Sequence, residues 1–99
     1  MVKQSSAYIY IIQLGNNHIY KIAKSNYDNY VQTLQLGTPD DLKIVYMEYF
    51  EEAINIKGLL HKKFKNYQKK TDWFRFSDDM LNECIDYLEE LHETNNNKN

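Results

Sequence analysis

The sequence is poor in several residue types that build familiar kinds of functional site. It has one cysteine, Cys84, so an internal disulfide and a cysteine-rich zinc site are both excluded. It contains no glycine-rich phosphate loop, no Ser-His-Asp or Cys-His arrangement and no histidine-rich metal motif. Arginine occurs once, at Arg75. Cys84 falls on the apolar stripe of a predicted helix, where we expect a small buried side chain.

Long hydrophobic runs are also missing. No apolar stretch approaches the ~18 to 20 residues that span a bilayer, and the first ten residues, MVKQSSAYIY, lack the core of a signal peptide. We therefore expect an intracellular protein without a membrane partner. The 99 residues, 42% of them hydrophobic, are enough for one core, so we expect a single domain.

The charges are segregated along the chain, although the net charge is only -2. Residues 57–75 carry 7 basic and 1 acidic groups (+6), residues 76–99 carry 1 and 7 (-6), and residues 1–56 carry 4 and 6 (-2). A basic block beside an acidic block can form a phosphate-binding patch, or two faces that pair within the molecule or across a dimer. From charge alone, a solvated surface is the first interpretation.

Hydrophobic periodicity predicts an α+β fold with a small three-stranded antiparallel sheet flanked by helices. Alternating residues predict strands over 7–14, 18–24 and 42–50, the first two joined by a Gly-Asn-Asn turn. In the third strand, alternation predicts that Ile44 and Tyr46 share one face. Three- and four-residue spacing predicts helices over 25–36, 51–64 and 78–92, the last beginning at Ser77.

The remaining segments complete the predicted order β-β-α-β-α-(β)-α. For residues 72–76 we predict a short strand or an extended segment that places Trp73 and Phe74 in the core. For the preceding segment NYQKKT we predict a loop. Residues 1–92 are expected to form the domain, and the low-complexity segment 93–99 a disordered tail.

The ordered motifs of the chain resemble a known superfamily. They are a YIY strand, the sequence YKIAK, a helix ending in LQLGTP, a helix carrying LLHKKF, and DWFRFS. This series is similar to the GIY-YIG nuclease superfamily, and more closely to the compact GIY-YIG-like domain of phages and large DNA viruses, which is often described as DNA-binding. The similarity runs from Tyr8 to Ser77 and leaves out the helix 78–92. It implies a viral or phage protein, located in the host cytoplasm or nucleus if viral.

The resemblance also implies positions for catalytic groups. In active members, a tyrosine from each of the first two strands lies at the cleavage site, an arginine steadies the phosphate, and a glutamate holds a divalent metal. The two tyrosines match Tyr10 and Tyr20 here, and Ala23 replaces the glycine that closes the second motif. The arginine position falls on Tyr30 and the glutamate position on Lys57.

These two replacements predict a catalytically degenerate domain. No carboxylate lies between Glu52 and Asp72, and the lysine cation at Lys57 would repel a metal ion. Losing one charge contact to a transition state commonly costs about 10²-fold in rate. We therefore expect no cofactor, with Mg²⁺ required only if nuclease activity survives through Glu51, Glu52 or Asp72.

Other interpretations of the same residues stay open. Tyr10 and Tyr20 are equally well explained as ordinary strand residues, Lys57 could bind a phosphate in place of the metal, and His61 either points into the same cleft or packs. Tyr67, in the predicted loop, is the aromatic residue expected to be free for base stacking. The predicted nucleic-acid contacts are Lys21, Lys24, Lys57, Lys62, Lys63, Lys65, Tyr67, Lys69, Lys70 and Arg75.

Several functions follow from this pattern. The leading hypothesis is a nucleic-acid-binding module that does not cleave its target, with DNA favoured over RNA. The second is a protein-interaction or decoy module on an inactive nuclease scaffold, which could form a homodimer and which the acidic last helix favours. The third is a residual metal-dependent endonuclease. A nucleotide phosphate pocket around Lys57, Tyr10 and Tyr20 is a less specific fourth.

Overall fold

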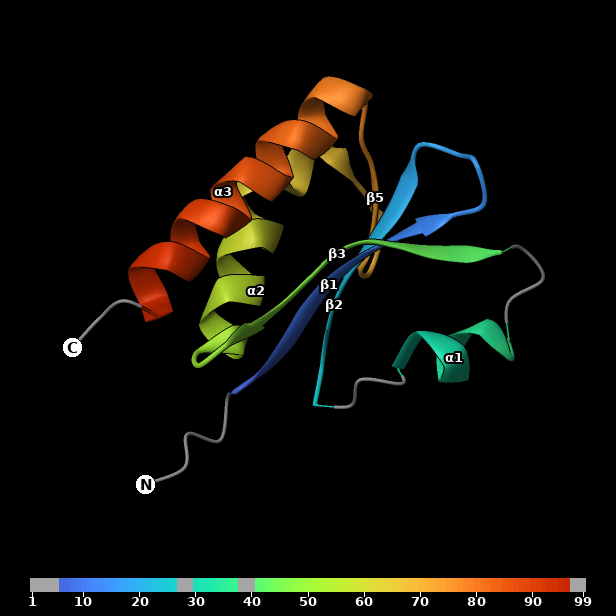
Figure 1. The fold of residues 1–99 in the computed structure, drawn as a ribbon. Helices are drawn as coiled ribbons and strands as arrows, with labels where there is room; N and C mark the ends of the chain where they lie inside the picture. The colour runs from blue at the N-terminus through green and yellow to red at the C-terminus, as the bar shows by residue number, and fades with distance from the viewer. Residues whose placement is uncertain (1–5, 27–29, 38–40, 97–99) are drawn as a thin grey trace.

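The computed structural model describes residues 6–26, 30–37 and 41–96, which are arranged around one antiparallel sheet (Figure 1). The sheet has the strand order β3-β1-β2-β5-β4. The strands are β1 (Ala7–Leu14), β2 (Ile19–Ser25), β3 (Leu42–Phe50), β4 (Gln68–Lys70) and β5 (Trp73–Arg75). The helices are α1 (Tyr30–Gln35), α2 (Ala53–Lys63) and α3 (Asp78–Asn96), with a short 3-10 helix η1 at Lys65–Tyr67. The α+β class is confirmed, but the described sheet has five strands where the sequence predicted three.

The two additional strands form the β4–β5 hairpin at one edge of the sheet. β5 is the optional strand predicted at 72–76, whereas β4 lies in the segment predicted as a loop. β5 pairs with β2 through three residues, Ile19 to Lys21, and β4 pairs only with β5. The turn between them holds Thr71 at a φ of 46°, a conformation that a β-branched residue rarely adopts.

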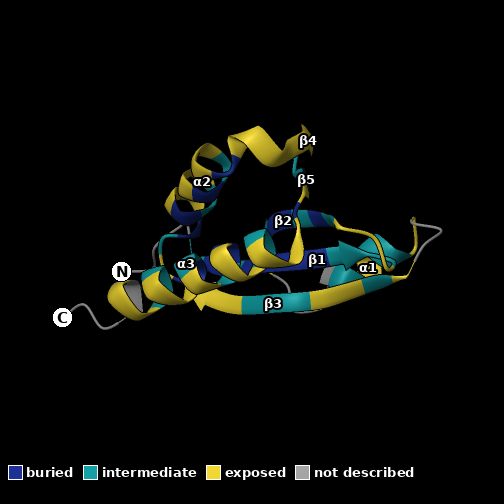
Figure 2. Ribbon diagram, turned by 90° about the horizontal axis from the view of Figure 1, so that it is seen from above, coloured by how far each residue is buried: buried dark blue, intermediate teal, exposed yellow. Residues whose placement is uncertain are grey.

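The sheet has two different faces. Helices α2 and α3 cover one of them, which we call the helix face, and α1 lies on the other side (Figure 1). Alternate residues of the strands point to the helix face and form the core there. Tyr10, Ile12 and Ala23 are buried on the other face, so β1 and β2 are dark over consecutive residues in Figure 2. The buried residues of this core include Ile9, Ile11, Tyr20, Ile22, Phe50, Phe74 and Phe76 from the sheet region and Ala53, Ile56, Leu60, Phe64, Cys84 and Leu88 from the helical region.

Strand β3 departs from strict alternation. Ile11 pairs with Tyr46 but the next residue, Ile12, pairs with Ile44, so Val45 is an extra residue in a β-bulge. The bulge puts Ile44 on the face opposite to Tyr46. The prediction that these two share a face is therefore wrong, because alternation assumes an uninterrupted ladder.

Helix α3 begins at the predicted residue but ends later than predicted. Its start is as predicted: the Ser77 hydroxyl accepts a hydrogen bond from the Met80 backbone N–H at 3.2 Å, which caps the helix. Its end lies beyond the prediction, since residues 93–96 of the expected tail are helical; residues 97–99 lie outside the described residues. Cys84 is fully buried on this helix, and burial raises the pKa of its thiol to about 12. No helix of the described part of the chain has the length and apolar character needed to cross a membrane.

Candidate nucleic-acid interface

The two motif tyrosines point to opposite faces of the sheet. Tyr10 pairs with Ala23, whereas Tyr20 pairs with Gln13, three positions farther along β1, and an odd offset of this kind puts the two tyrosines on opposite faces. Tyr20 is on the helix face, where only 2% of it is exposed and its ring stacks on Phe76 at 5.9 Å between ring centres. Tyr10 is fully buried on the other face. The two hydroxyl groups therefore cannot act on one phosphate.

The burial of Tyr20 has a chemical consequence. Burial, and secondarily the nearby Asp78 carboxylate, raise the pKa of the Tyr20 phenol above its usual value. A phenol that resists ionisation is a poor general base. Tyr30, at the predicted arginine position, is the first residue of α1, and its side chain lies outside the described residues.

Lys57 and His61 lie together, and His61 does both of the things that the sequence left open, since it faces the same hollow as Lys57 and also packs on Phe74. They are one turn apart on α2 and both face the carboxylate of Asp72, with the Lys57 Nζ at 3.3 Å and the His61 Nε2 at 3.6 Å from Oδ1. Lys21 approaches from β2, with its Nζ at 3.7 Å from Oδ2. We call Lys21, Lys57, His61 and Asp72 the Asp72 cluster. It borders a hollow of about 380 Å³ that Lys24, Ile54 and Gly58 also line.

Within the Asp72 cluster, His61 is held as a neutral ring. Burial lowers its pKa below the usual value and the Lys57 cation lowers it further, while Asp72 and the Ile22 backbone act in the opposite direction. The ring packs edge-on against Phe74 at 5.0 Å. At 3.6 Å its contact with Asp72 is electrostatic, and its buried Nε2 has no hydrogen-bond partner among the described residues.

A divalent metal does not fit this cluster. Asp72 is its one carboxylate, and two ammonium groups already compensate that charge. Across the described ranges, no group of three or more His, Cys, Asp or Glu side chains is close enough to hold a metal ion. Glu52, another predicted ligand, instead accepts a hydrogen bond from the Asn55 side chain at 3.2 Å. Hard cations need several oxygen ligands, and these residues do not offer them together.

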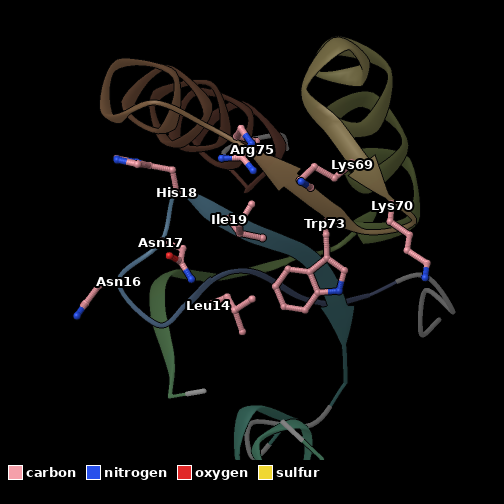
Figure 3. A pocket seen from close by; sticks show the side chains of 9 residues that line it. All are labelled: Leu14, Asn16, Asn17, His18, Ile19, Lys69, Lys70, Trp73 and Arg75. Carbon is pink, nitrogen blue, oxygen red and sulfur yellow. The ribbon is translucent and has the colours of Figure 1, made fainter. Parts of the chain in front are cut away.

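A larger groove of about 630 Å³ lies on the face of the sheet away from the core, between the β1–β2 turn and the β4–β5 hairpin (Figure 3). Trp73 stands in the middle of the groove, with Lys69 and Lys70 toward one end and the turn residues toward the other (Figure 3). The described residues that line it include no carboxylate. They are Leu14, Asn16, Asn17, His18, Ile19, Lys69, Lys70, Trp73 and Arg75.

The turn end of the groove is held in place by local hydrogen bonds. Gly15 adopts a φ of 59°, which suits glycine, and its N–H donates to the Asp41 carbonyl at 2.7 Å. The Gln13 side-chain amide donates to the Asn17 carbonyl at 3.0 Å. The exposed carboxamides of Asn16 and Asn17 are therefore presented by an ordered turn.

Trp73 and Lys21 are direct neighbours on β5 and β2. The Lys21 Nζ lies over the indole at 5.1 Å from the ring centre, which is within the range of a cation–π interaction. Only 14% of the Lys21 side chain is exposed, because it is enclosed between Trp73 and Asp72. Lys21 therefore supports the ring and also joins the groove to the Asp72 cluster.

The predicted nucleic-acid contacts are divided among several surfaces. Lys69, Lys70 and Arg75 line the groove, and Lys24 and Lys57 line the smaller hollow. Lys62 and Lys65 are exposed elsewhere. Lys63 lies over the Tyr87 ring at 4.9 Å, and Tyr67 packs on Phe64 and Phe76.

The prediction for stacking residues is wrong in one respect. Trp73 was expected in the core with Phe74, but only Phe74 is buried there, and Trp73 is partly exposed in the groove. Other groove residues that the sequence reasoning missed are Leu14, Asn16, Asn17, His18 and Ile19. Alternation within the predicted strand 72–76 is the signal for Trp73, because it places Trp73 and Phe74 on opposite faces. The turn residues reach the groove through the pairing of β5 with β2, which no local signal specifies.

Comparison with known proteins places this arrangement in a family. Residues 7–89, from the start of β1 well into α3, match the T5orf172 domain, a phage-associated domain. The match includes every strand of the described sheet and all residues of the groove. No curated protein and no solved structure gives a significant match. The chain belongs to the T5orf172 domain family.

Proposed function

We propose that this T5orf172 domain is a nucleic-acid-binding module that holds a strand without cleaving it. The groove is the observation that carries the proposal. Lys69, Lys70 and Arg75 line it together with the partly exposed Trp73. Binding of a phosphate backbone depends on clustered cations, and an aromatic ring beside them allows contact with bases. DNA is favoured over RNA on the GIY-YIG resemblance alone.

The absence of cleavage is proposed from the charges at the motif positions. Lys57 occupies the position where the GIY-YIG resemblance implies a metal-binding glutamate, and its ammonium group pairs with Asp72. Tyr10 and Tyr20 face opposite sides of the sheet. A transition state that gathers negative charge at phosphorus would find neither a metal nor two phenols at one place.

The first test is binding of a fluorescently labelled oligonucleotide of mixed sequence, measured by anisotropy with Mg²⁺ present. Three phosphate contacts on a single strand predict that log K falls with log salt at a slope of roughly -2, so affinity drops about 20-fold between about 50 and about 200 mM salt. A gel of the same samples reports whether the strand remains intact. Absence of binding at the lower salt concentration would contradict the proposal. Cleavage that a chelator abolishes would instead indicate a nuclease.

A pair of double variants separates the groove from general charge. Lys69→Glu with Lys70→Glu reverses two charges in the groove, and Lys62→Glu with Lys65→Glu makes the same change on exposed residues outside it. We expect the groove variant to lose 10-fold or more in affinity and the second variant to lose clearly less. A lysine in direct contact with a phosphate contributes more to the binding free energy than a lysine that attracts the strand from a distance through salt. Equal losses would show that the groove is not the binding surface.

A protein-interaction module is the second candidate function. It is favoured by apolar side chains that remain exposed, Leu36 with 89% and Ile54 with 56% of their surface accessible. Leu36 follows α1 and Ile54 lies on α2, so they are separate exposed residues on opposite sides of the sheet, and each would contribute singly to a contact surface. Self-association in light scattering, combined with no oligonucleotide affinity, would favour this function over nucleic-acid binding.

A further inference from the structure

We infer that the groove selects single-stranded nucleic acid, with one unpaired base stacked on the indole of Trp73. This inference rests on the proposed function and names the form of the ligand. Its starting point is the position of Trp73, the only tryptophan of the chain, which is partly exposed in the middle of a groove whose other members are polar, basic or aliphatic (Figure 3).

The indole is prepared for stacking because one side of it is already fixed. Lys21 lies over the ring at 5.1 Å from its centre and is itself held by Asp72 at 3.7 Å. Asp72 is held in turn by Lys57 on α2. Because the contact with Lys21 already restricts the indole, the ring loses little conformational freedom when a base stacks on it.

The groove residues are distributed as a single strand would need them. Lys69 and Lys70, both exposed, lie toward one end and can contact phosphates on one side of the indole (Figure 3). The carboxamides of Asn16 and Asn17 lie toward the other end and can donate to and accept from the edges of a base (Figure 3). Leu14 and Ile19 give an apolar lining next to the indole.

A duplex cannot use this arrangement. Its bases are stacked on one another and present only their edges in the grooves, so an indole has no base face to contact. Proteins that hold single strands combine a basic track with aromatic rings, and each stacked base contributes substantially to affinity. The groove volume of about 630 Å³ is within the range of ~300 to 1,000 Å³ found for sites that enclose small organic ligands, so it can hold a base with its sugar.

The experiment uses the complete chain and its own tryptophan. Three ligands are titrated: a pyrimidine single strand, the same strand with abasic sugars throughout, and the corresponding duplex. Anisotropy of a labelled end gives each affinity, and Trp73 fluorescence reports whether a base reaches the indole. We expect the normal single strand to bind at least 10-fold more tightly than the abasic strand and the duplex, and it alone should quench Trp73.

Variants locate the effect at the ring. Trp73→Leu should lose about 10-fold in affinity for the normal single strand and nothing for the abasic strand, while Trp73→Phe should retain part of the difference. Tyr49→Leu is the matched control, because it removes an exposed aromatic residue of β3 outside the groove. The comparison of normal and abasic strands on the unaltered protein keeps the test decisive even if Trp73→Leu does not fold.

The outcomes separate this inference from the function on which it rests. Equal binding of normal and abasic strands, or tighter binding of the duplex with unchanged Trp73 fluorescence, would overturn the single-strand inference and leave nucleic-acid binding in place. No binding of any of the three ligands would overturn both. A further titration uses a free pyrimidine mononucleotide, and Trp73 quenching as strong as that by the strand would show a nucleotide pocket and contradict strand recognition.

Discussion

Asp72 shows how one side chain can organise a surface. Its carboxylate is 30% exposed and lies within 4 Å of nitrogen atoms from Lys21, Lys57 and His61. Because its charge is opposed by two ammonium groups, it orients the lysines of β2 and α2 more than it attracts a further cation. Lys21 also contacts Trp73, so the position of the groove ring depends on a carboxylate that the groove itself does not contain.

The neutral state of His61 predicts a pH-dependent stability. Its pKa is lowered in the folded chain by burial and by Lys57 against the attraction of Asp72, whereas in the unfolded chain it is near 6.5. The unfolded state therefore binds a proton first as the pH falls, so stability present above about pH 6.5 is lost as the pH falls through the lowered pKa.

We expect urea unfolding of the natural chain to give a lower free energy at about pH 5.5 than at about pH 7.5, and His61→Gln to reduce this difference. The remaining histidines serve as internal controls: His18 is exposed and His92 contacts Glu48 at 3.4 Å. An unchanged pH dependence in His61→Gln would assign the effect to other groups.

At the scale of elements, long segments were predictable and short ones were not. Strands β1 and β3 and helices α2 and α3 have enough residues for their periodicity to be read from the sequence. β4 has three residues and was missed, because so few positions cannot distinguish alternation from chance. The bulge at Val45 and the register of β2 against β5 arise from pairing between strands, and no local pattern specifies them.

The parts of the candidate site that depend on contacts between distant segments were unpredictable for the same reason. Tyr10 and Tyr20 were assigned together from motif order, but their faces depend on which residues pair across the turn. Lys57 and His61 are four residues apart on a helix, and this local relation brings both side chains to one carboxylate, although the sequence left open whether His61 packs or faces the cleft. Their partner Asp72 comes from a distant turn, so sequence spacing gave no reason to place it there.

Helix α2 contains a position whose substitution should stabilise the fold. Gly58 lies within the helix, and a Cβ built on it has no atom within 4 Å. Gly58→Ala should therefore raise the free energy of unfolding by about 1 kcal/mol, since alanine restricts the unfolded chain and meets no obstacle in the folded one. Urea denaturation of both proteins measures the change. A neutral or destabilising result would mean that the hollow beside Gly58 has a role that a methyl group disturbs.

At the scale of the whole molecule, the segregated charges of the sequence are separated only in part, because Lys57, Lys62 and Lys63 lie on α2, on the same side of the sheet as α3. The acidic helix α3 packs over the helix face, and the basic groove opens on the opposite side. A net charge of -2 is compatible with a phosphate-binding groove. At ordinary salt, the electrostatic interaction between exposed charges is screened beyond about 10 Å, so the acidic groups of α3 repel a phosphate in the groove only weakly. Asp78 is the exception, since it pairs with His18 of the groove at 3.7 Å.

Removing the Asp78 carboxylate should strengthen the binding of a single strand in the groove. Asp78→Asn eliminates a carboxylate beside the groove. We expect affinity for a single strand to rise about 2- to 5-fold at low salt, the size expected for removing the repulsion between one exposed carboxylate and the phosphates. Asp86→Asn changes the same charge farther along α3 and should have a smaller effect. Anisotropy titrations at low and high salt compare them. If the two variants gained equally, only the overall charge of the molecule would matter.

The alternation along β2 and β5 has an evolutionary consequence. Ile19, Trp73 and Arg75 line the groove, while Tyr20 and Phe74, which interrupt them in sequence, are core residues. Substitutions at the groove positions can therefore change the ligand without disturbing the interior. A one-residue insertion or deletion within either strand would exchange the two sets and place Phe74 in water. Relatives should accordingly diverge by replacement within these strands and by length only in the turns.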